Sequence, residues 1–294
     1  QYPPLAIRGG TLSGIAWKTP VASAQVKSAI LLAGLQASGE TSVTEPTLSR
    51  DHTERMLTAF GVVPQRRGTT VSVPGKARLA AASLSIPGDL SSAAFFIAAA
   101  AARPGAEVIL RDVGVNPTRT GALEVLAAMG ATITQERERS EGGEPVADIH
   151  VRGAHLRGTT IGPDLIPRLL DEIPALAVAA ALAEGETVIS GAAELRVKEV
   201  DRLSALAGEL AKLGVQVVEE RDSLRIVGGR RLRRAVVSSR GDHRMAMSLA
   251  VAGLFSEGET RIQDVACVET SFPGFARLLL EVAPGCDIRE VGDE

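Results

Sequence analysis

The hydrophobic and polar positions of this chain repeat one pattern four times. An apolar segment with helical period ends in a glycine turn, a short β-rich run follows, and a polar stretch then opens a second helix. The turns are Gly39-Glu40-Thr41, Gly105-Ala106-Glu107, Gly185-Glu186-Thr187 and Gly258-Glu259-Thr260. They lie roughly 65 to 80 residues apart, which is too long for a solenoid and suits a repeated small α/β unit.

The periods predict where the elements lie. Helices are expected over residues 23–37, 51–60, 91–102, 120–129, 171–183, 198–213, 243–255 and 272–282. Strands are expected over residues 42–44, 108–110, 187–189, 215–218 and 261–263, with short strands within 7–19 and a hairpin-like pair within 62–73. The polar stretch 135–145 is expected to be a surface excursion. Each copy then has the order β-α-β-α-β-β, which predicts an α/β fold of repeated units in two domains.

Pro87-Gly88 ends the first copy and gives the best domain boundary. We expect residues 1–86 to form one domain with a single unit, and residues 87–294 to form a second domain with about three units. A single unit this rich in apolar helix would leave hydrophobic faces uncovered. We therefore expect a partner for the first domain that this chain does not contain.

Composition excludes several classes of function. A net charge of −3 and 3% aromatic residues argue against a general polyanion binder and against a surface that stacks nucleic-acid bases. No apolar run is long enough to predict a membrane span. Cys267 and Cys286 lack the spacing of metal ligands and suit a reducing cytoplasm. Any anion site must therefore be local, and we expect neither nucleic acid nor a membrane as partner.

The charged and hydroxyl side chains that could carry chemistry gather where helices are expected to begin. Helix N-termini favour anions, so these positions suit an anion-binding site. Lys198 and Arg202 are four residues apart and are expected to share one helix face, where they repel unless an anion or carboxylate lies between them. On this segment alone, a solvated helix start is the better interpretation. Asp171 precedes an apolar helix, so it is either a simple cap or, if it faces the same cleft as Lys198, an acid/base group.

The same pattern occurs at three other predicted helix starts. Asp242 is expected to cap the helix that His243 and Arg244 open. A cation there opposes the helix dipole, which favours a bound carboxylate or phosphate. Ser23 with Gln25, and Ser49 with Arg50, could either cap their helices or hold phosphate oxygens.

Five segments together resemble the 5-enolpyruvylshikimate-3-phosphate synthase family. They are YPPLAIRGG (2–10), VASAQVKSA (21–29), SRDHTERM (49–56), KEVDR (198–202) and GDHRMAM (241–247), in the family's order along the whole chain. The resemblance implies transfer of the enolpyruvyl group of phosphoenolpyruvate to the 5-hydroxyl of shikimate 3-phosphate, with release of phosphate, in aromatic amino acid biosynthesis. It implies no metal or organic cofactor, and a fold of two domains with three β-α-β-α-β-β units each.

The resemblance also assigns roles to residues. Shikimate 3-phosphate would be held by Ser23, Gln25, Arg50, Asp171 and Lys198. Phosphoenolpyruvate would be held by Gln25, Arg202, His243 and Arg244. Asp171 would be the base that takes the hydroxyl proton, with Lys198 at the same hydroxyl, and Glu199 would donate and accept the proton at the phosphoenolpyruvate methylene carbon.

Alternatives remain open at this point. The related UDP-N-acetylglucosamine enolpyruvyltransferases share the repeats, but their reactive cysteine loop has no counterpart here. A non-catalytic anion-binding remnant of the fold would not need the acid/base groups, and the acidity disfavours an RNA-end-processing protein.

The family's opening segment and its Asn-Ala-Gly-Thr loop are not in this sequence, so about four of six units are expected, with a complementary N-terminal fragment as a possible partner. We expect the chain alone to bind shikimate 3-phosphate weakly and to have negligible turnover, because the residues that grip the phosphoenolpyruvate phosphate lie in the absent segments. A steady-state assay of phosphate release checks this. Turnover near that of a full-length relative would contradict it.

Overall fold

A computed structural model describes residues 4–289 and 291. Gln1 lies outside the described residues, and so do Tyr2 and Pro3, which open the first family-like segment. The chain divides into two compact units, which we call unit 1 (residues up to 86, with 140–145) and unit 2 (residues 87–139 and 146 onward).

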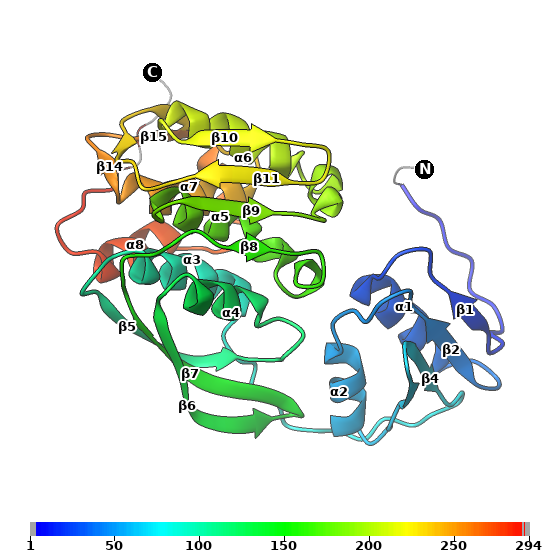
Figure 1. Cartoon of the computed structure of the whole chain (residues 1–294). Coiled ribbons are helices and arrows are strands. Elements are labelled where there is room, and N and C mark those ends of the chain that lie inside the picture. The colour runs from blue at the N-terminus through cyan, green and yellow to red at the C-terminus, as the bar shows by residue number, and fades with distance from the viewer. Residues whose placement is uncertain (1–3, 290, 292–294) are drawn as a thin grey trace. The chain divides into compact units, whose positions relative to one another are not determined.

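Unit 1 has the expected order β-α-β-α-β-β (Figure 1). Its elements are β1 (Ala16–Lys18), α1 (Ala24–Gly34), β2 (Thr41–Thr44), α2 (His52–Ala59), β3 (Gln65–Arg67) and β4 (Thr70–Val73). The sheet has the order β1-β2-β4-β3, in which β1 is parallel to β2 and the other pairs are antiparallel. Alternate residues of β2 and β4, such as Val43 and Val71, pack with Leu31 of α1 and Leu57 of α2.

Unit 2 contains the same topology again. Its elements are β8 (Thr160–Ile161), α5 (Ile173–Leu182), β9 (Glu186–Ile189), α6 (Arg202–Lys212), β10 (Gln216–Glu219) and β11 (Leu224–Val227). β8 is parallel to β9, β9 is antiparallel to β11, and β11 is antiparallel to β10, as in the sheet of unit 1. The repeated α/β unit predicted from the sequence is therefore confirmed.

Two further copies in unit 2 are less complete. One comprises α3 (Leu90–Ala101), β5 (Glu107–Gly114), α4 (Gly121–Ala128), β6 (Thr132–Glu141) and β7 (Glu144–Arg152), and a parallel bridge from Gly88 to Val113 stands in for its first strand. The other has β13 (Val236–Ser238), α7 (His243–Gly253), β15 (Arg261–Gln263) and α8 (Phe275–Val282), with β13 parallel to β15. The short strand β12 (Leu232–Arg233) precedes β13, and the short strand β14 (Ser256–Glu257) precedes β15. β12 and β14 pair in parallel.

The first helix of each copy in unit 2 lies in the core. α3, α5 and α7 pack on one another, and Figure 1 shows them inside the sheets. α5 is apolar all round, and its residues from Ile173 to Ala181 are buried. The corresponding helix of unit 1, α1, buries only Lys27, Leu31 and Gly34, while Val26 and Leu32 are 45% and 42% exposed. The expectation of an uncovered apolar face in unit 1 is confirmed.

One local prediction was incomplete and one was wrong. The polar stretch 135–145 lies at the surface, as expected, but it forms the end of the hairpin of β6 and β7. The sequence does not reveal β6, because nearly all of its side chains are exposed and no apolar alternation appears in it. The helix expected from Lys198 begins only at Arg202, because the Asp201 side chain accepts the Ser204 N–H and caps it there. Lys198 and Arg202 therefore do not share a helix face.

Glycines mark equivalent points in the copies. The four turn glycines that define the sequence repeat, Gly39, Gly105, Gly185 and Gly258, all have φ between 81° and 99°, where a side chain is disfavoured. A second position became visible only in the structure. Gly75, Gly153 and Gly228 follow the last strand of their copies and lie against main-chain oxygens at the end of the copy's first helix.

We expect Gly228→Ala to destabilise the chain by about 3 kcal/mol, because an added Cβ would lie 2.2 Å from the carbonyl oxygen of Ala180, which cannot move without shifting α5. Urea unfolding measures this. Gly162→Ala is the matched control, because a Cβ there meets nothing within 4 Å, and it should leave the free energy of unfolding nearly unchanged. Equal effects of the two substitutions would contradict the packing argument.

Candidate active site

Four helix N-termini of unit 2 meet in one place. Between their first turns, the Ser91 hydroxyl of α3 donates to the Glu172 carboxylate before α5, and Arg244 Nη1 of α7 donates to the main-chain oxygen of Asp171 over 3.2 Å. Arg202, the first residue of α6, bonds the cap of α7. The positive ends of four helices thus surround one region, which favours anions. The structure brings together every candidate of unit 2: Asp171, Lys198, Glu199, Arg202, His243 and Arg244.

Arg202 is a buried cation at the centre of this group, with 1% of its side chain exposed. Its Nε donates to Asp242 Oδ2 over 2.7 Å and one Nη2 hydrogen goes to Glu199 Oε2 over 2.6 Å. Its Nη1 lies 3.5 Å from Asp171 Oδ1, and this buried nitrogen has no hydrogen-bond acceptor among the described residues. The guanidinium therefore neutralises nearby carboxylates and still has a donor to offer.

Asp171 lies beside two cations. Besides Arg202, Lys198 Nζ is 3.9 Å from Asp171 Oδ1, and the same ammonium bonds Glu194 Oε1 over 2.8 Å. The sequence left two interpretations of Asp171, a simple cap or a group that faces Lys198. The structure shows the second arrangement, because Lys198 Nζ and Arg202 Nη1 both lie beside Asp171 Oδ1. A partly exposed carboxylate flanked by cations can receive a proton from a bound hydroxyl.

The N-terminus of α7 is built as expected. Asp242 Oδ1 accepts the N–H groups of Arg244 (2.8 Å) and Met245 (3.2 Å), so the predicted cap is confirmed. Arg244 makes no ion pair with any described residue, which leaves its charge available to an anion. Burial and then the neighbouring Arg244 lower the pKa of His243, because both disfavour the imidazolium. His243 is therefore a neutral hydrogen-bonding group near pH 7.

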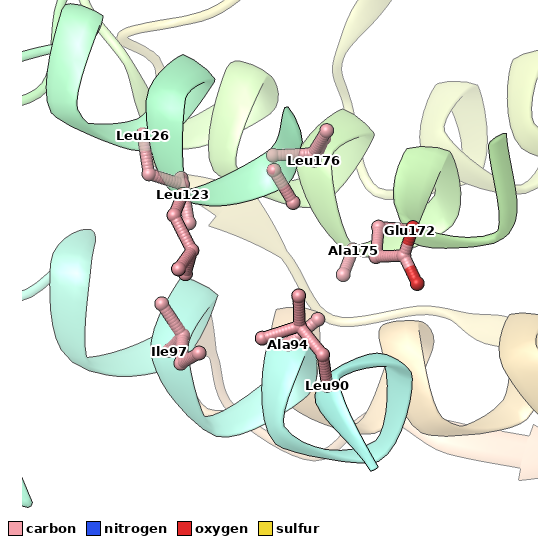
Figure 2. A pocket seen from close by; sticks show the side chains of 9 residues that line it. Leu90, Ala94, Ile97, Leu123, Leu126, Glu172, Ala175 and Leu176 are labelled. Carbon is pink, nitrogen blue, oxygen red and sulfur yellow. The ribbon is translucent and has the colours of Figure 1, made fainter. Parts of the chain in front are cut away.

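Glu172 is a further member of this region. Its side chain is 1% exposed, and burial raises the pKa of its carboxyl. Ser91 donates to it, and Arg119 donates to Ser91. The carboxyl lies at the edge of an apolar crevice between α3, α4 and α5 that has no space for water (Figure 2). The sequence signal that could have indicated a buried carboxyl was the position of this acidic residue directly before an all-apolar helix.

The candidates of unit 1 lie around the N-termini of α1 and α2. Ser23 caps α1, and its hydroxyl accepts the Val26 N–H over 3.4 Å. Gln25 is exposed and Arg50 is half-buried. Sequence reasoning missed Lys27 and Glu45, which are buried directly behind them. A cation on the same helix stripe as Leu31 and Gly34 was the signal for Lys27.

Comparisons with known proteins identify the family of the chain. The family model described as EPSP synthase (3-phosphoshikimate 1-carboxyvinyltransferase) matches residues 1–279. The chain belongs to the EPSP synthase family. It is 59% identical over 276 residues to the 3-phosphoshikimate 1-carboxyvinyltransferase of Desulforudis audaxviator, and 53% identical over 283 residues to that of Brevibacillus brevis. These matches cover 94% and 96% of this chain but 64% and 66% of the relatives, so the chain spans about two thirds of their length.

Solved structures show the same fold. An EPSP synthase from Acinetobacter baumannii superposes with a TM-score of 0.87 at 48% identity, covering 92% of this chain and 63% of that one. The predicted family and fold class are confirmed. Among the described residues, no group of three or more His, Cys, Asp or Glu side chains could hold a metal ion.

Glu172→Gln tests the buried carboxyl. A raised folded-state pKa means that the stability tied to the protonated form is present at acidic pH and is lost as pH rises from the unfolded value, about 4.3, through the folded one. The amide cannot ionise, so the free energy of unfolding of the variant should rise relative to that of wild type as pH rises across this window. Urea unfolding between pH 4 and 8 measures the difference.

The control for that series is Glu124→Gln, which removes a half-exposed carboxylate of α4 that pairs with Arg168. The free energy of unfolding of this control should change with pH in nearly the same way as that of wild type. Parallel curves for Glu172→Gln would show that burial does not raise the pKa of Glu172.

Proposed function

We propose that this chain contributes the groups described above to an enzyme that transfers the enolpyruvyl group of phosphoenolpyruvate to the 5-hydroxyl of shikimate 3-phosphate, with release of phosphate, and that turnover also needs the family segments that this sequence lacks. The observation that carries the proposal is the meeting of Lys198, Arg202 and Arg244 on Asp171 at four helix N-termini. The activity printed in the names of the relatives supports it.

Arg202 and Arg244 are the groups proposed for the phosphoenolpyruvate carboxylate. A planar guanidinium matches a carboxylate in a two-point contact, and Arg202 is already fixed by its buried partners. His243 adds a neutral hydrogen-bonding group beside them, which orients the carboxylate without adding charge.

Asp171 and Glu199 are the groups proposed to move protons. Glu199 is half-exposed and lies beside Arg202. In its protonated form it is proposed to give a proton to the methylene carbon of phosphoenolpyruvate. The 5-hydroxyl oxygen then bonds the adjacent cationic carbon while Asp171 takes the hydroxyl proton, with Lys198 beside the hydroxyl. A methyl proton returns to Glu199 as the bond between this carbon and the phosphate oxygen breaks, which restores the double bond, and the proton on Asp171 leaves with the phosphate.

Ser23, Gln25 and Arg50 in unit 1 are proposed to hold shikimate 3-phosphate, with Gln25 also touching phosphoenolpyruvate. They supply hydroxyl, amide and guanidinium donors near the positive ends of α1 and α2, which suit a phosphate-bearing ligand. A cytoplasmic location fits the proposal, and no helix in the described ranges is long and apolar enough to cross a bilayer.

Calorimetric titration of the chain tests the substrate assignment. Shikimate 3-phosphate should bind, and Arg50→Gln should weaken it by about tenfold or more, because it removes a charge-assisted bond. Arg66→Gln, at an exposed arginine of β3 in the same unit, is the matched control and should leave the affinity unchanged. UDP-N-acetylglucosamine should not bind; if it binds and shikimate 3-phosphate does not, the assignment is wrong.

A further inference from the structure

Unit 1 contains a buried charged cluster that the proposed roles do not use. It consists of Lys27 on α1, Glu45 after β2 and Glu54 on α2, whose side chains are 2%, 1% and 15% exposed. Lys27 lies on the buried stripe of α1 with Leu31 and Gly34, where an apolar side chain would be expected. Burying an ion pair is a poor source of stability, because desolvation offsets most of the attraction. The cluster therefore calls for an explanation besides folding.

The Glu45 carboxylate bonds two of the segments proposed to hold substrate. Its Oε1 accepts the main-chain N–H of Ser23 over 3.1 Å, and its Oε2 accepts the hydroxyl of Ser49 over 2.9 Å. Lys27 Nζ lies 3.2 Å from the same Oε2. One buried carboxylate thus joins the N-cap of α1 to the loop that carries Arg50.

Lys27 also holds the loop that carries Arg50. Its ammonium donates to the main-chain oxygen of Arg50 over 2.9 Å and pairs with Glu54 Oε1 over 2.8 Å. All three donors of the ammonium are accounted for by Glu45, Glu54 and this carbonyl. The backbone at Ser23 and Arg50 is therefore fixed by charge-assisted hydrogen bonds to the buried side chains of Glu45 and Lys27. Such bonds are stronger than neutral ones.

We propose that Glu45 and Lys27 are positioning residues for shikimate 3-phosphate. They hold the backbone of Ser23 and Arg50 so that the side chains of these two residues meet the ligand without reorganising. The inference rests on the proposed function, because it takes Ser23 and Arg50 as ligand contacts. Fixing a loop in its bound conformation raises affinity by lowering the ordering cost of binding.

Two variants separate the charge of Glu45 from its reach. Glu45→Gln keeps the length and loses the charge opposite Lys27, while Glu45→Asp keeps the charge but is too short to reach both Ser23 and Ser49. Each should raise the Kd of shikimate 3-phosphate by about tenfold, as expected when a preorganised contact is loosened. Because Glu45→Asp keeps the ion pair, it should stay folded if Glu45→Gln does not.

The matched control is Asp148→Asn in unit 2. Asp148 is also a buried carboxylate that holds a main-chain N–H, that of Asp112 over 2.9 Å, and a cation, Arg137 over 3.2 Å, but it touches no proposed ligand residue. Thermal unfolding of all variants is recorded beside calorimetric titration. A Kd change in the Glu45 variants no larger than in Asp148→Asn overturns the inference.

Amide hydrogen exchange at Ser23 separates this inference from the proposed function. In both Glu45 variants the Ser23 amide should exchange faster than in wild type, whether or not ligand binds. If wild type fails to bind shikimate 3-phosphate, the proposed function is wrong. If the Ser23 amide exchanges at the wild-type rate in the Glu45 variants, the positioning role is wrong.

Discussion

The buried guanidinium of Arg202 is the contact on which the candidate site of unit 2 depends. It joins the first turn of α6 to the cap of α7 through Asp242, and lies beside the segment before α5 through Asp171. Removing one partner from such a buried group costs about 3–5 kcal/mol, because the remaining charge stays desolvated. The positive ends of neighbouring helices would otherwise repel, so the carboxylates around Arg202 allow them to converge.

Unit 1 also contains a buried cation surrounded by carboxylates, formed by different residues. Lys27 stands between Glu45 and Glu54 as Arg202 stands among its three carboxylates, and each cation lies behind a helix start that carries candidate ligand contacts. In both places the buried charges hold neighbouring segments of the chain together by hydrogen bonds. Small residues make the scaffold possible: the alanines of α3 and α5 let helices approach closely, and Gly75, Gly153 and Gly228 admit main-chain oxygens where a Cβ would clash.

Much of this architecture could be predicted from the chain. Apolar period and turn glycines placed the α-helices and the strands β2, β5, β9 and β15, which follow the turn glycines, whereas the strands β8, β11, β12, β13 and β14 were not predicted. Asp242 was recognisable as a cap because its residue type and position suffice. The hairpin of β6 and β7 was missed because its outward side chains are all polar. The start of α6 was misplaced because the largely charged residues 198–201 were included in the helix, whereas Asp201 caps it by accepting the Ser204 N–H.

The sequence by itself determined the family, the repeated unit and the residue types at each helix start, since these follow from local period and motif. Which of those residues face one another was decided only by tertiary structure. Asp171, Lys198 and Arg244 are far apart along the chain, and they meet because α5, α6 and α7 pack with their N-termini together. The sequence alone assigned no role to Glu172, Glu45 and Lys27. Only burial gave them partners, because desolvation depends on what packs around a side chain and not on its neighbours in sequence.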